Sequence, residues 1–432
     1  MVVKPGRSIG EPLGVRRHGL RFNRSQFMLL SLQVFLVGMT LGLMRTVVPA
    51  LAEREFGVPR GSFLLLVTFV VAFGAVKAVM NLVAGRLAER AGRRRVLLAG
   101  WLVAWPIPLL IHQAPSWSWL VVATVLLGVQ QGLCWSMTQT AQLDLGCPAE
   151  RGRVIGLNEL AGYGGVAIAG VVTGLLAQVL GPRLGLLRFG TLVIGLATLL
   201  AWLVVAETLP WARQEHVARG AGWSTRRVFI HTSWSDRRLA ALCQAGLVEK
   251  FVDALAWVVW PVWLLQRGVD LPTIGGICGV YGFAWGSAQL LTGALSDRWG
   301  RQALNVGGMW TCAAGVALMP LGITVTWWSL SAGLTGLGMA MLYPNLSAAV
   351  VDLSEAKWRA SAVGVYRFWR DLGYAVGALG LGMAAALGGG LQVAFGFVAV
   401  AMLISGGVLL RWGTETCLAA GLAGSTTDDA SP

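Results

Sequence analysis

The segment Gly85-Arg-Leu-Ala-Glu-Arg-Ala-Gly-Arg93 occurs again 208 positions later as Gly293-Ala-Leu-Ser-Asp-Arg-Trp-Gly-Arg301. The same offset continues through the following loops and apolar segments without an insertion, taking Asp144 to Asp352, Arg151 to Arg359, Gly156 to Gly364 and Gly165 to Gly373. Nearer the start of each repeat, an offset of 212 takes Pro49 to Pro261. Agreement over this length predicts that the chain consists of two related halves.

Composition places both halves in a membrane. Of the 432 residues, 56% are hydrophobic and 12% are charged, whereas a soluble domain carries about 25% charged residues. The apolar residues gather in runs close to the roughly 20 residues that a helix needs to cross a bilayer. The predicted fold class is therefore an all-α polytopic membrane protein. The net charge of +14 does not indicate a nucleic-acid partner, because the basic residues lie beside the apolar runs and form no single patch.

Twelve apolar runs are predicted to be transmembrane helices. They lie at 26–51, 61–84, 96–113, 117–141, 154–180, 184–206, 239–265, 272–294, 304–322, 326–350, 360–386 and 391–410. The predicted organisation is a basic arm 1–25, a six-helix bundle 26–206, a central loop 207–238, a second six-helix bundle 239–410 and a polar tail 411–432. With the N-terminus inside, cytoplasmic segments hold 24 of the 34 Lys and Arg residues and outer loops hold four, so both termini are predicted to be cytoplasmic.

Other chemistries lack the residues that they need. The six cysteines are scattered without a C-x-x-C pair, so no metal centre is predicted. None of the four lysines follows a glycine, which argues against a nucleotide-binding phosphate loop, and no nucleophile stands beside a base within a span. We therefore predict a monomeric, non-enzymatic protein without a cofactor, embedded in a lipid bilayer. The Arg-, Ala- and Gly-rich composition is typical of a bacterial inner membrane protein, with a specialised intracellular membrane as the alternative.

Two parallel six-span halves, a basic central loop and the pattern G-x-L-x-[DE]-R-x-G-R in the second loop of each half resemble the major facilitator superfamily of secondary transporters. The resemblance covers roughly residues 26–410. It implies two pseudo-symmetric six-helix bundles that rock about a central site near the bilayer midplane. A small solute is then the implied ligand, and the fold alone does not identify it.

The repeated loop motif predicts a gating latch between the halves. Its glycines permit a tight turn, its acids can face a helix N-terminus, and its arginines can pair with an aspartate at the inner end of span 4 or span 10. The predicted latch residues are Gly85, Glu89, Arg90, Gly92, Arg93 and Asp144 in the first half, and Gly293, Asp297, Arg298, Gly300, Arg301 and Asp352 in the second. Because Glu89 replaces the usual Asp of the family, the first latch is expected to be the looser one. The alternative is that these arginines only fix the topology.

Ionisable groups within the spans are the strongest candidates for function, because each costs several kcal/mol unless it is paired or hydrated. Arg45 in span 1 has no acid within one helical turn, so it needs a partner on another helix or an anionic solute; the alternative is an arginine that snorkels at the outer end. Lys77 and Asn81 in span 2 are interpreted as structural residues that reach the inner interface.

Apart from Arg188, near the outer end of span 6, the remaining charges lie in spans 5, 7 and 11. Lys250, Asp253 and Trp257 follow one face of span 7 beside Glu249, and Arg367, Arg370 and Asp371 share one face of span 11. The 208 offset sets Arg367 opposite Glu159 of span 5, for which Lys250 or another cation is the expected partner. The predicted proton-coupling residues are Glu159, Glu249, Asp253 and Asp371, with structural ion pairing as the alternative.

Polar side chains in spans 4 and 10 complete the candidate site. Gln131, Trp135 and Gln139 follow one face of span 4, while Tyr343 and Asn345 flank Pro344 in span 10. They can either hydrogen-bond a polar ligand or hold helices together. The predicted substrate-binding residues are Arg45, Gln131, Trp135, Gln139, Lys250, Asp253, Trp257, Tyr343, Asn345, Arg367 and Arg370.

The spans contain six basic and four acidic residues, an excess that favours an anionic or zwitterionic solute. The sequence therefore predicts a secondary active transporter that is coupled to protons. A drug:proton antiporter is the first alternative, although that branch of the family usually has an Arg where this chain has Gly128, and a Gly-Pro pair in span 5 that is absent here. A sensor or scaffold that keeps the transporter fold is the second alternative.

Overall fold

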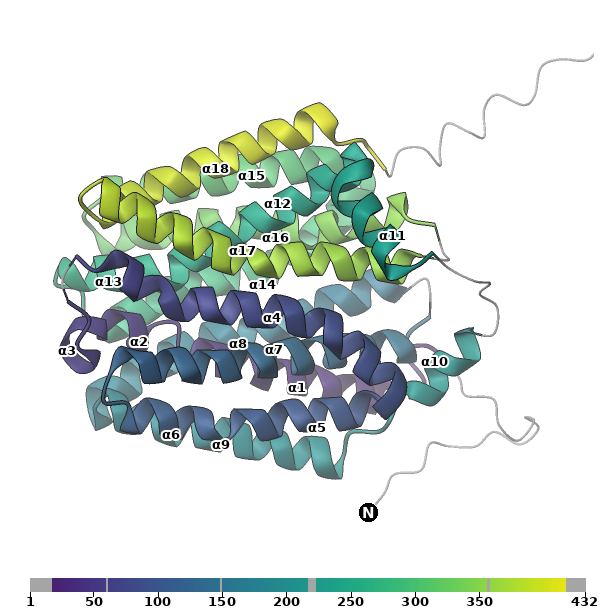
Figure 1. Cartoon of the computed structure of the whole chain (residues 1–432), viewed down its shortest axis with the longest axis horizontal. Helices are drawn as coiled ribbons and strands as arrows, with labels where there is room; N and C mark the ends of the chain where they lie inside the picture. The colour runs from purple at the N-terminus through teal and green to yellow at the C-terminus, as the bar shows by residue number, and fades with distance from the viewer. Residues whose placement is uncertain (1–17, 60, 148–149, 217–222, 356–357, 417–432) are drawn as a thin grey trace, which may run out of the picture.

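The computed structural model describes residues 18–59, 61–147, 150–216, 223–355 and 358–416. The described chain crosses the molecule twelve times as helices, which run roughly side by side in two groups (Figure 1). The first half contains α1 (Arg24–Gly42) with the short α2 (Val47–Ala50) and α3 (Ala52–Phe56), then α4 (Phe63–Ala91), α5 (Arg93–Ala104) with α6 (Pro106–Gln113), α7 (Trp117–Leu145), α8 (Arg151–Leu180) and α9 (Pro182–Leu203). Two short helices, α10 (Leu209–His216) and α11 (Thr225–Ile230), follow before the second half.

The second half repeats this order. It contains the π-helical turn η2 (His231–Ser235), then α12 (Arg237–Ala254), η3 (Leu255–Val259) and α13 (Trp260–Gln266) as one pass, α14 (Leu271–Trp299), α15 (Arg301–Leu318) with η4 (Met319–Leu321), α16 (Val325–Leu353), α17 (Arg359–Leu387) and α18 (Leu391–Trp412). The bounds of α14 and α16 are those of α4 and α7 displaced by 208 positions. The predicted fold, twelve spans in two pseudo-symmetric bundles, is confirmed.

The turn within each loop motif is shorter than the sequence indicated. Helix α4 continues to Ala91 and α14 to Trp299, so Gly85 and Gly293 lie inside helices and not in a turn. The turn is made by Gly92 and Gly300 alone, whose φ angles of 93° and 91° favour glycine. The expectation that four glycines form the turns was therefore wrong for Gly85 and Gly293.

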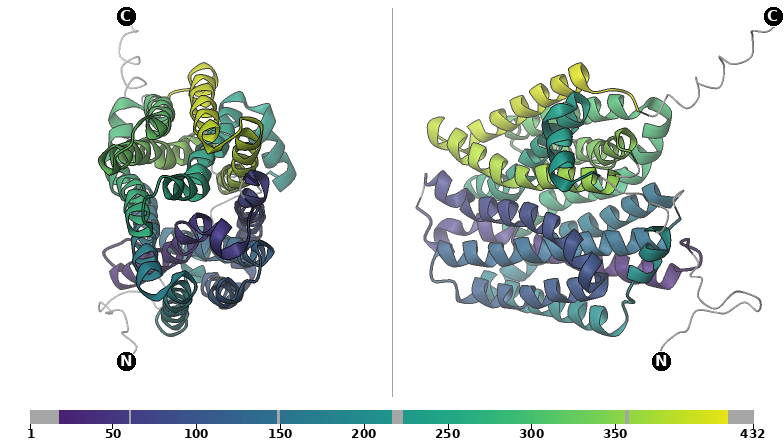
Figure 2. Two further views of the ribbon diagram at one scale, coloured as in Figure 1. Left: turned by 90° about the vertical axis from the view of Figure 1, so that its left-hand side faces the viewer. Right: turned by 45° about the vertical axis from the view of Figure 1, so that its right-hand side comes forward.

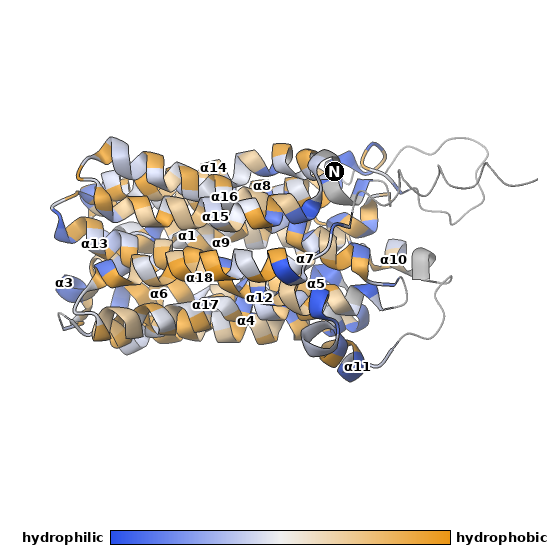
Figure 3. Cartoon of the chain, turned by 90° about the horizontal axis from the view of Figure 1, so that it is seen from above, coloured by the Kyte–Doolittle hydropathy of each residue, from blue (hydrophilic) through white to orange (hydrophobic). Residues whose placement is uncertain are grey.

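The halves differ in how apolar their passes are. Nine described stretches are long and apolar enough to span a membrane; they include every pass of the first half but only 301–321, 325–353 and 391–412 of the second. The passes that contain Glu249 or Arg370 do not qualify, and charge within a span is a physical reason for this. Figure 3 shows hydrophobic residues along the helices and hydrophilic ones concentrated at the two ends.

The halves pack more closely at one end than at the other. We call the end where the described chain begins and stops, at His18 and Thr416, the terminal end; it lies at the right of Figure 1, and Figure 2 shows the halves from two further sides. At the far end, a Cβ added to Gly174 would lie 2.8 Å from the carbonyl oxygen of Leu271 in the other half. Near the terminal end, no such neighbour lies within 4 Å of a Cβ built on Gly85, Gly156, Gly293 or Gly364. The halves therefore pack closely at the far end, whereas these four glycines near the terminal end have no such close neighbour.

Candidate functional site

A buried ion pair joins the first passes of the two halves. Arg45 lies in the turn between α1 and α2, is 7% exposed, and donates from its guanidinium to the carboxylate of Asp253 on α12. Its guanidinium carbon also lies 5.1 Å from the ring centroid of Trp257. The partner on another helix, which the sequence required, is thus an acid of the other half. The alternative of an outer-end snorkelling arginine was wrong.

Asp253 has several partners besides Arg45. The ammonium of Lys250 lies 3.7 Å from its second oxygen, which also accepts a hydrogen bond from the Tyr374 hydroxyl. The Tyr281 hydroxyl lies 3.4 Å from the oxygen that Arg45 contacts. Two cations and two hydroxyl groups therefore stabilise one fully buried carboxylate, which keeps its charge tolerable in a low-dielectric interior.

Lys250 is enclosed by aromatic rings. Its ammonium lies 4.6 Å from the ring centroid of Trp285 and 5.3 Å from that of Tyr343, and it donates to the hydroxyl of Tyr163 at 3.3 Å. Glu249, also fully buried, lies 3.6 Å away as a second acid. Lys250 and Asp253 pair with each other, and each also has a further charged partner, Glu249 for Lys250 and Arg45 for Asp253.

A second charged group crosses between the halves. Asp371 on α17 lies 3.3 Å from the guanidinium of Arg370 and 3.8 Å from the ammonium of Lys77 on α4, and it accepts a hydrogen bond from Asn81. The sequence analysis left Lys77 and Asn81 out of the site. A charge in the middle of span 2 was the available signal, but which helix faces it cannot be determined from one sequence.

Glu159 on α8 has neutral partners. The indole of Trp135 and the amide of Gln139, both on α7, each donate to the same carboxylate oxygen at 3.1 Å. No ion pair joins Glu159 to a described residue, so the expectation that it pairs with Lys250 was wrong: Lys250 is held by its own neighbours on α12. Arg367, at the position of Glu159 in the other half, is half-buried and likewise forms no ion pair with a described residue.

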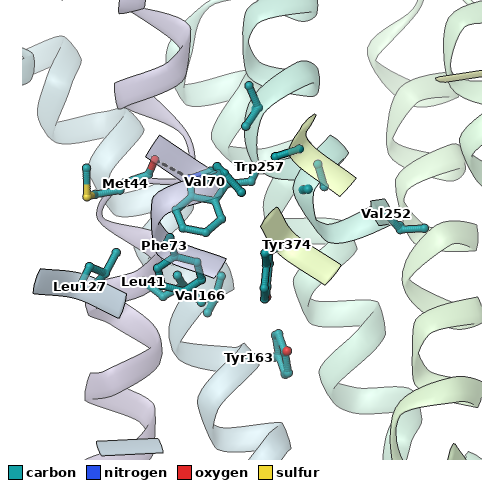
Figure 4. Packing of buried hydrophobic residues seen from close by; sticks show 14 of the residues in the cluster. Leu41, Met44, Val70, Phe73, Leu127, Tyr163, Val166, Val252, Trp257 and Tyr374 are labelled. Atoms are coloured by element: carbon teal, nitrogen blue, oxygen red, sulfur yellow. Dashed lines mark hydrogen bonds between the residues drawn. The ribbon is translucent and has the colours of Figure 1, made fainter. Parts of the chain in front are cut away.

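Other predicted ligand-binding residues hold the backbone together. Gln131 donates to the carbonyl of Val37 at 2.9 Å, and Trp257 donates to that of Met44 at 2.8 Å. Figure 4 shows Trp257 with its bond to Met44 and, nearby, Phe73 and Tyr374. Asn345 donates to the carbonyl of its own helix at Met341. The contacts of Gln131 and Trp257 favour the interpretation that such groups hold helices together, whereas that of Asn345 stays within α16.

The proline in α16 leaves a backbone carbonyl that a neighbouring helix satisfies. Pro344 has no N–H, so the carbonyl of Ala340 loses its helical donor. The hydroxyl of Thr292 on α14 donates to that carbonyl at 2.6 Å. Tyr343, beside the proline, has the guanidinium of Arg370 4.5 Å and the ammonium of Lys250 5.3 Å from its ring centroid.

At the terminal end, the two copies of the loop motif make matching ion pairs. Arg93 lies 2.9 Å from Asp144, and Arg301 lies 2.8 Å from Asp352. Both pairs stay within one half, so these two ion pairs do not themselves supply the contact between the halves that the sequence predicted. Glu89 and Arg90 are exposed, and the side chains of Asp297 and Arg298 lie outside the described residues.

Each ion pair is completed by two residues that the sequence analysis missed. Glu207 accepts hydrogen bonds from the backbone N–H groups of Arg93 and Arg94 at 2.8 and 3.2 Å, and so caps α5, while the hydroxyl of Thr208 donates to Asp144 at 2.8 Å. In the second half, Glu415 caps α15 and Thr416 donates to Asp352 in the same way. The 208 offset, extended to the end of each half, would have found them.

The burial of the two ion pairs is unequal. The side chains of Arg93 and Asp144 are 7% and 10% exposed, against 17% and 29% for Arg301 and Asp352. The expectation of a looser first latch rested on Glu89, which takes no part in these bridges. The first copy is in fact the more enclosed one.

Among the described residues, no group of three His, Cys, Asp or Glu side chains is arranged to hold a metal ion.

Comparison with known proteins fits this geometry. A model of the Major Facilitator Superfamily matches residues 30–378 and, in a second match, 242–423. The chain belongs to the major facilitator superfamily. It is a multi-pass membrane transporter with a small-molecule substrate, and not an enzyme.

Individual relatives of this transporter are distant. It is 24% identical over 362 residues to the MFS-type transporter STM4428 of Salmonella typhimurium, covering 80% of this chain and 86% of that one. It is 26% identical over 371 residues to a protein of Cupriavidus pinatubonensis named as a probable 4-methylmuconolactone transporter, covering 82% of each. A crystal structure of a D-xylose-proton symporter matches with a TM-score of 0.74 at 14% identity, covering 91% of this chain and 98% of that one, and so shares the fold.

Proposed function

We propose that this transporter moves a small anionic or zwitterionic solute by alternating access, coupled to protons, across the cytoplasmic membrane of a bacterium. The terminal end is then cytoplasmic, in agreement with the excess of basic residues there. The arrangement described above is the inward-facing one. The name of the Cupriavidus relative is consistent with a small organic solute.

One observation carries the proposal of an anion. In the interior, the acids Asp253 and Asp371 are each shared by two cations, whereas the guanidinium of Arg367 forms no ion pair with a described residue. Arg367 lies one turn from Arg370 on α17, and Glu159 and Tyr343 act on it electrostatically. A carboxylate that entered from the terminal end would find in Arg367 a planar donor with its hydrogen-bonding capacity unused.

Glu159 is the proposed proton carrier. Protonating a carboxylate that is held by cations leaves those cations without their partner. Protonating one that is surrounded by neutral donors costs less free energy, so such a group can change its charge as the transporter changes state. Asp253 and Asp371 are fixed by ion pairs and serve the structure. Glu249, which forms an ion pair with Lys250, is the second candidate among the predicted coupling residues.

A ligand screen tests the anion. The apparent unfolding temperature of the purified transporter is measured with organic anions, amino acids, sugars and lipophilic cations, because a ligand of the native state stabilises it. We expect an anion or zwitterion to raise this temperature, and Arg367→Gln to lower its affinity by at least ten-fold. Arg188→Gln, an exposed arginine of α9, is the matched control and retains affinity. Stabilisation by lipophilic cations alone would contradict the proposal and favour the drug antiporter; no stabilisation by any panel would favour the sensor or scaffold.

A flux assay tests the coupling. In proteoliposomes, Glu159→Gln is expected to abolish accumulation driven by a pH gradient while exchange of labelled for unlabelled solute continues. Glu249→Gln is measured in parallel and is expected to keep the pH-driven accumulation. If the two variants behave in the opposite way, the coupling belongs to Glu249.

A further inference from the structure

A cavity at the terminal end lies outside the transport path. It has a volume of about 360 Å³ and is lined by residues of α11, of η2 and of the segment that precedes them: Trp223, Ser224, Arg226, Arg227, His231 and Ser235. Helix α11 runs across the direction of the spans, beside the terminal end of α17 (Figures 1 and 2). The first pass of the second half begins two residues after Ser235, so the cavity lies where the chain enters the bilayer.

The charge of this cavity is positive and uncompensated. Neither Arg226 nor Arg227 forms an ion pair with a described residue, and both are exposed. The only acid between 223 and 238 is Asp236, which lies 2.8 Å from the guanidinium of Arg238. Hydrogen bonds and the charge of Arg238 outweigh the burial of Asp236 and lower the pKa of that carboxyl, so it stays with Arg238. An anionic group can therefore approach Arg226 and Arg227 without an internal competitor.

The cavity has a firm aromatic wall. The rings of Trp223 and Trp358 are stacked with centroids 5.2 Å apart, and His231 packs on both. The guanidinium of Arg227 lies 4.2 Å above the Trp223 ring, which fixes its direction. The indole of Trp369 on α17 donates to the Ser233 hydroxyl at 2.8 Å and so attaches η2 to the bundle. The cations are thus mounted on a rigid element, and the Ser224 and Ser235 side chains supply further donors.

Apolar side chains beside the cations point to a lipid. Trp234 is 66% exposed and Ile230 is 44% exposed, although each belongs to a residue type that is usually covered. Ile230 lines the cavity together with Arg226 and Arg227. A short segment in which arginines stand beside exposed Trp and Ile is typical of structures that lie in the headgroup region of a bilayer. Arginine also matches the geometry of a phosphate, to which it can donate two parallel hydrogen bonds.

We propose that this cavity binds the phosphate of an anionic phospholipid headgroup, with Arg226 and Arg227 as its ligands and with Trp234 and Ile230 against the acyl chains. The site is separate from the proposed solute site. Because η2 is bonded to α17, which carries Arg367 and packs against α4 of the other half, a bound lipid stabilises a helix of the interface between the halves.

Lipid-dependent stability tests the site. Short-chain phosphatidylglycerol, short-chain phosphatidylcholine and inorganic phosphate are each added to the full-length protein in detergent, and the unfolding temperature is measured. We expect phosphatidylglycerol alone to raise it by several degrees, with the effect reduced at high salt. The double variant R226Q/R227Q loses this rise and R226K/R227K keeps part of it, while the matched control R86Q/R95Q, which removes two exposed arginines at the same end of the first half, keeps it in full.

Three outcomes would overturn the proposal. An equal rise with inorganic phosphate would identify a site for a soluble anion. An equal loss in R86Q/R95Q would indicate a diffuse effect of charge. If the R226Q/R227Q protein does not fold, the wild type is labelled with a photoactivatable phosphatidylglycerol; cross-links concentrated in 223–238 support the site, and cross-links spread over all basic segments refute it.

Discussion

The two interfaces between the halves use equivalent positions for different chemistry. Where α4 meets α17, Lys77 pairs with Asp371; where α8 meets α14, the rings of Tyr163 and Trp285 are in contact, with centroids 3.6 Å apart and planes tilted by 30°. The 208 offset takes Lys77 to Trp285 and Tyr163 to Asp371. The repeat has thus kept the helices and changed the contact between them.

This difference suggests a division of labour. An ion pair within a membrane responds to an incoming charge, because that charge changes its electrostatic balance, whereas two aromatic rings in contact do not. The contact between α4 and α17 is the one suited to respond to the charge of a solute. The contact between α8 and α14 is suited to act as a passive pivot.

The largest effect is expected from breaking the ionic interface. Asp371→Asn leaves Lys77 and Arg370 as buried cations without their acid, which costs about 3–5 kcal/mol of folding free energy. Tyr163→Phe, at the equivalent position, removes one hydroxyl and costs about 1 kcal/mol. Unfolding in mild detergent and solute flux measure both. The double variant Lys77→Gln/Asp371→Asn is expected to recover part of the stability, and no recovery would show that the ion pair is not what the single variant destroys.

The second effect concerns how closely the helices approach. A Cβ on Gly74 of α4 would lie 2.5 Å from the backbone nitrogen of Ala375, whereas one on Gly282, its equivalent in α14, would lie 3.0 Å from the Cβ of Ala167. Gly74→Ala should therefore force α4 from α17 and cost about 1–3 kcal/mol, with a smaller cost for Gly282→Ala. Cysteines introduced at the far end should react faster with a thiol reagent in Gly74→Ala, and not in Gly282→Ala. Equal reactivity in the two variants would contradict the proposed difference between the two interfaces.

A smaller effect is expected where the halves are alike. Glu207→Ala and Glu415→Ala each remove a helix cap, at about 1 kcal/mol each. Because the caps lie in different halves without shared partners, the losses should add in the double variant. Glu207→Ala should lower the free energy of unfolding slightly more than Glu415→Ala, since the neighbouring Arg93–Asp144 ion pair is more buried than the Arg301–Asp352 pair. The free energy of unfolding of the three variants provides the test, and a loss confined to one variant would show that the two copies are not equivalent.

The smallest effect is a dependence on pH. Hydrogen bonds from the backbone N–H groups of Cys147 and Leu20 lower the pKa of the Glu150 carboxyl below its ordinary value of 4.5. This contribution to stability is present above pH 4.5 and is lost as the pH falls through the lowered pKa. The unfolding temperature of Glu150→Gln should accordingly fall less than that of the wild type on acidification. The equivalent position holds Trp358, and Trp358→Phe should leave the wild-type pH dependence in place.

The sequence predicted the features that repeat along the chain or follow the period of a helix. It missed the contacts that depend on which helices face each other. The twelve spans and the two halves follow from apolar runs and a nearly constant offset, and the loop motif indicated that its arginines pair with Asp144 and Asp352, although not that each pair stays within one half. The partners of Arg45, Lys77 and Glu159 do not, because helical periodicity fixes which residues share a face but not which helix lies opposite. Glu207 and Glu415 were overlooked because each caps a helix that begins 114 positions earlier.

That separation of 114 positions also bears on biosynthesis. Helix α5 stays uncapped until the chain has been made as far as Glu207, and α15 until it has been made as far as Glu415. The first half therefore holds its complete set of terminal-end contacts before the second half is translated. A chain that stops after Trp412 would contain every span and still lack one cap, so a fusion or a tag belongs beyond Thr416.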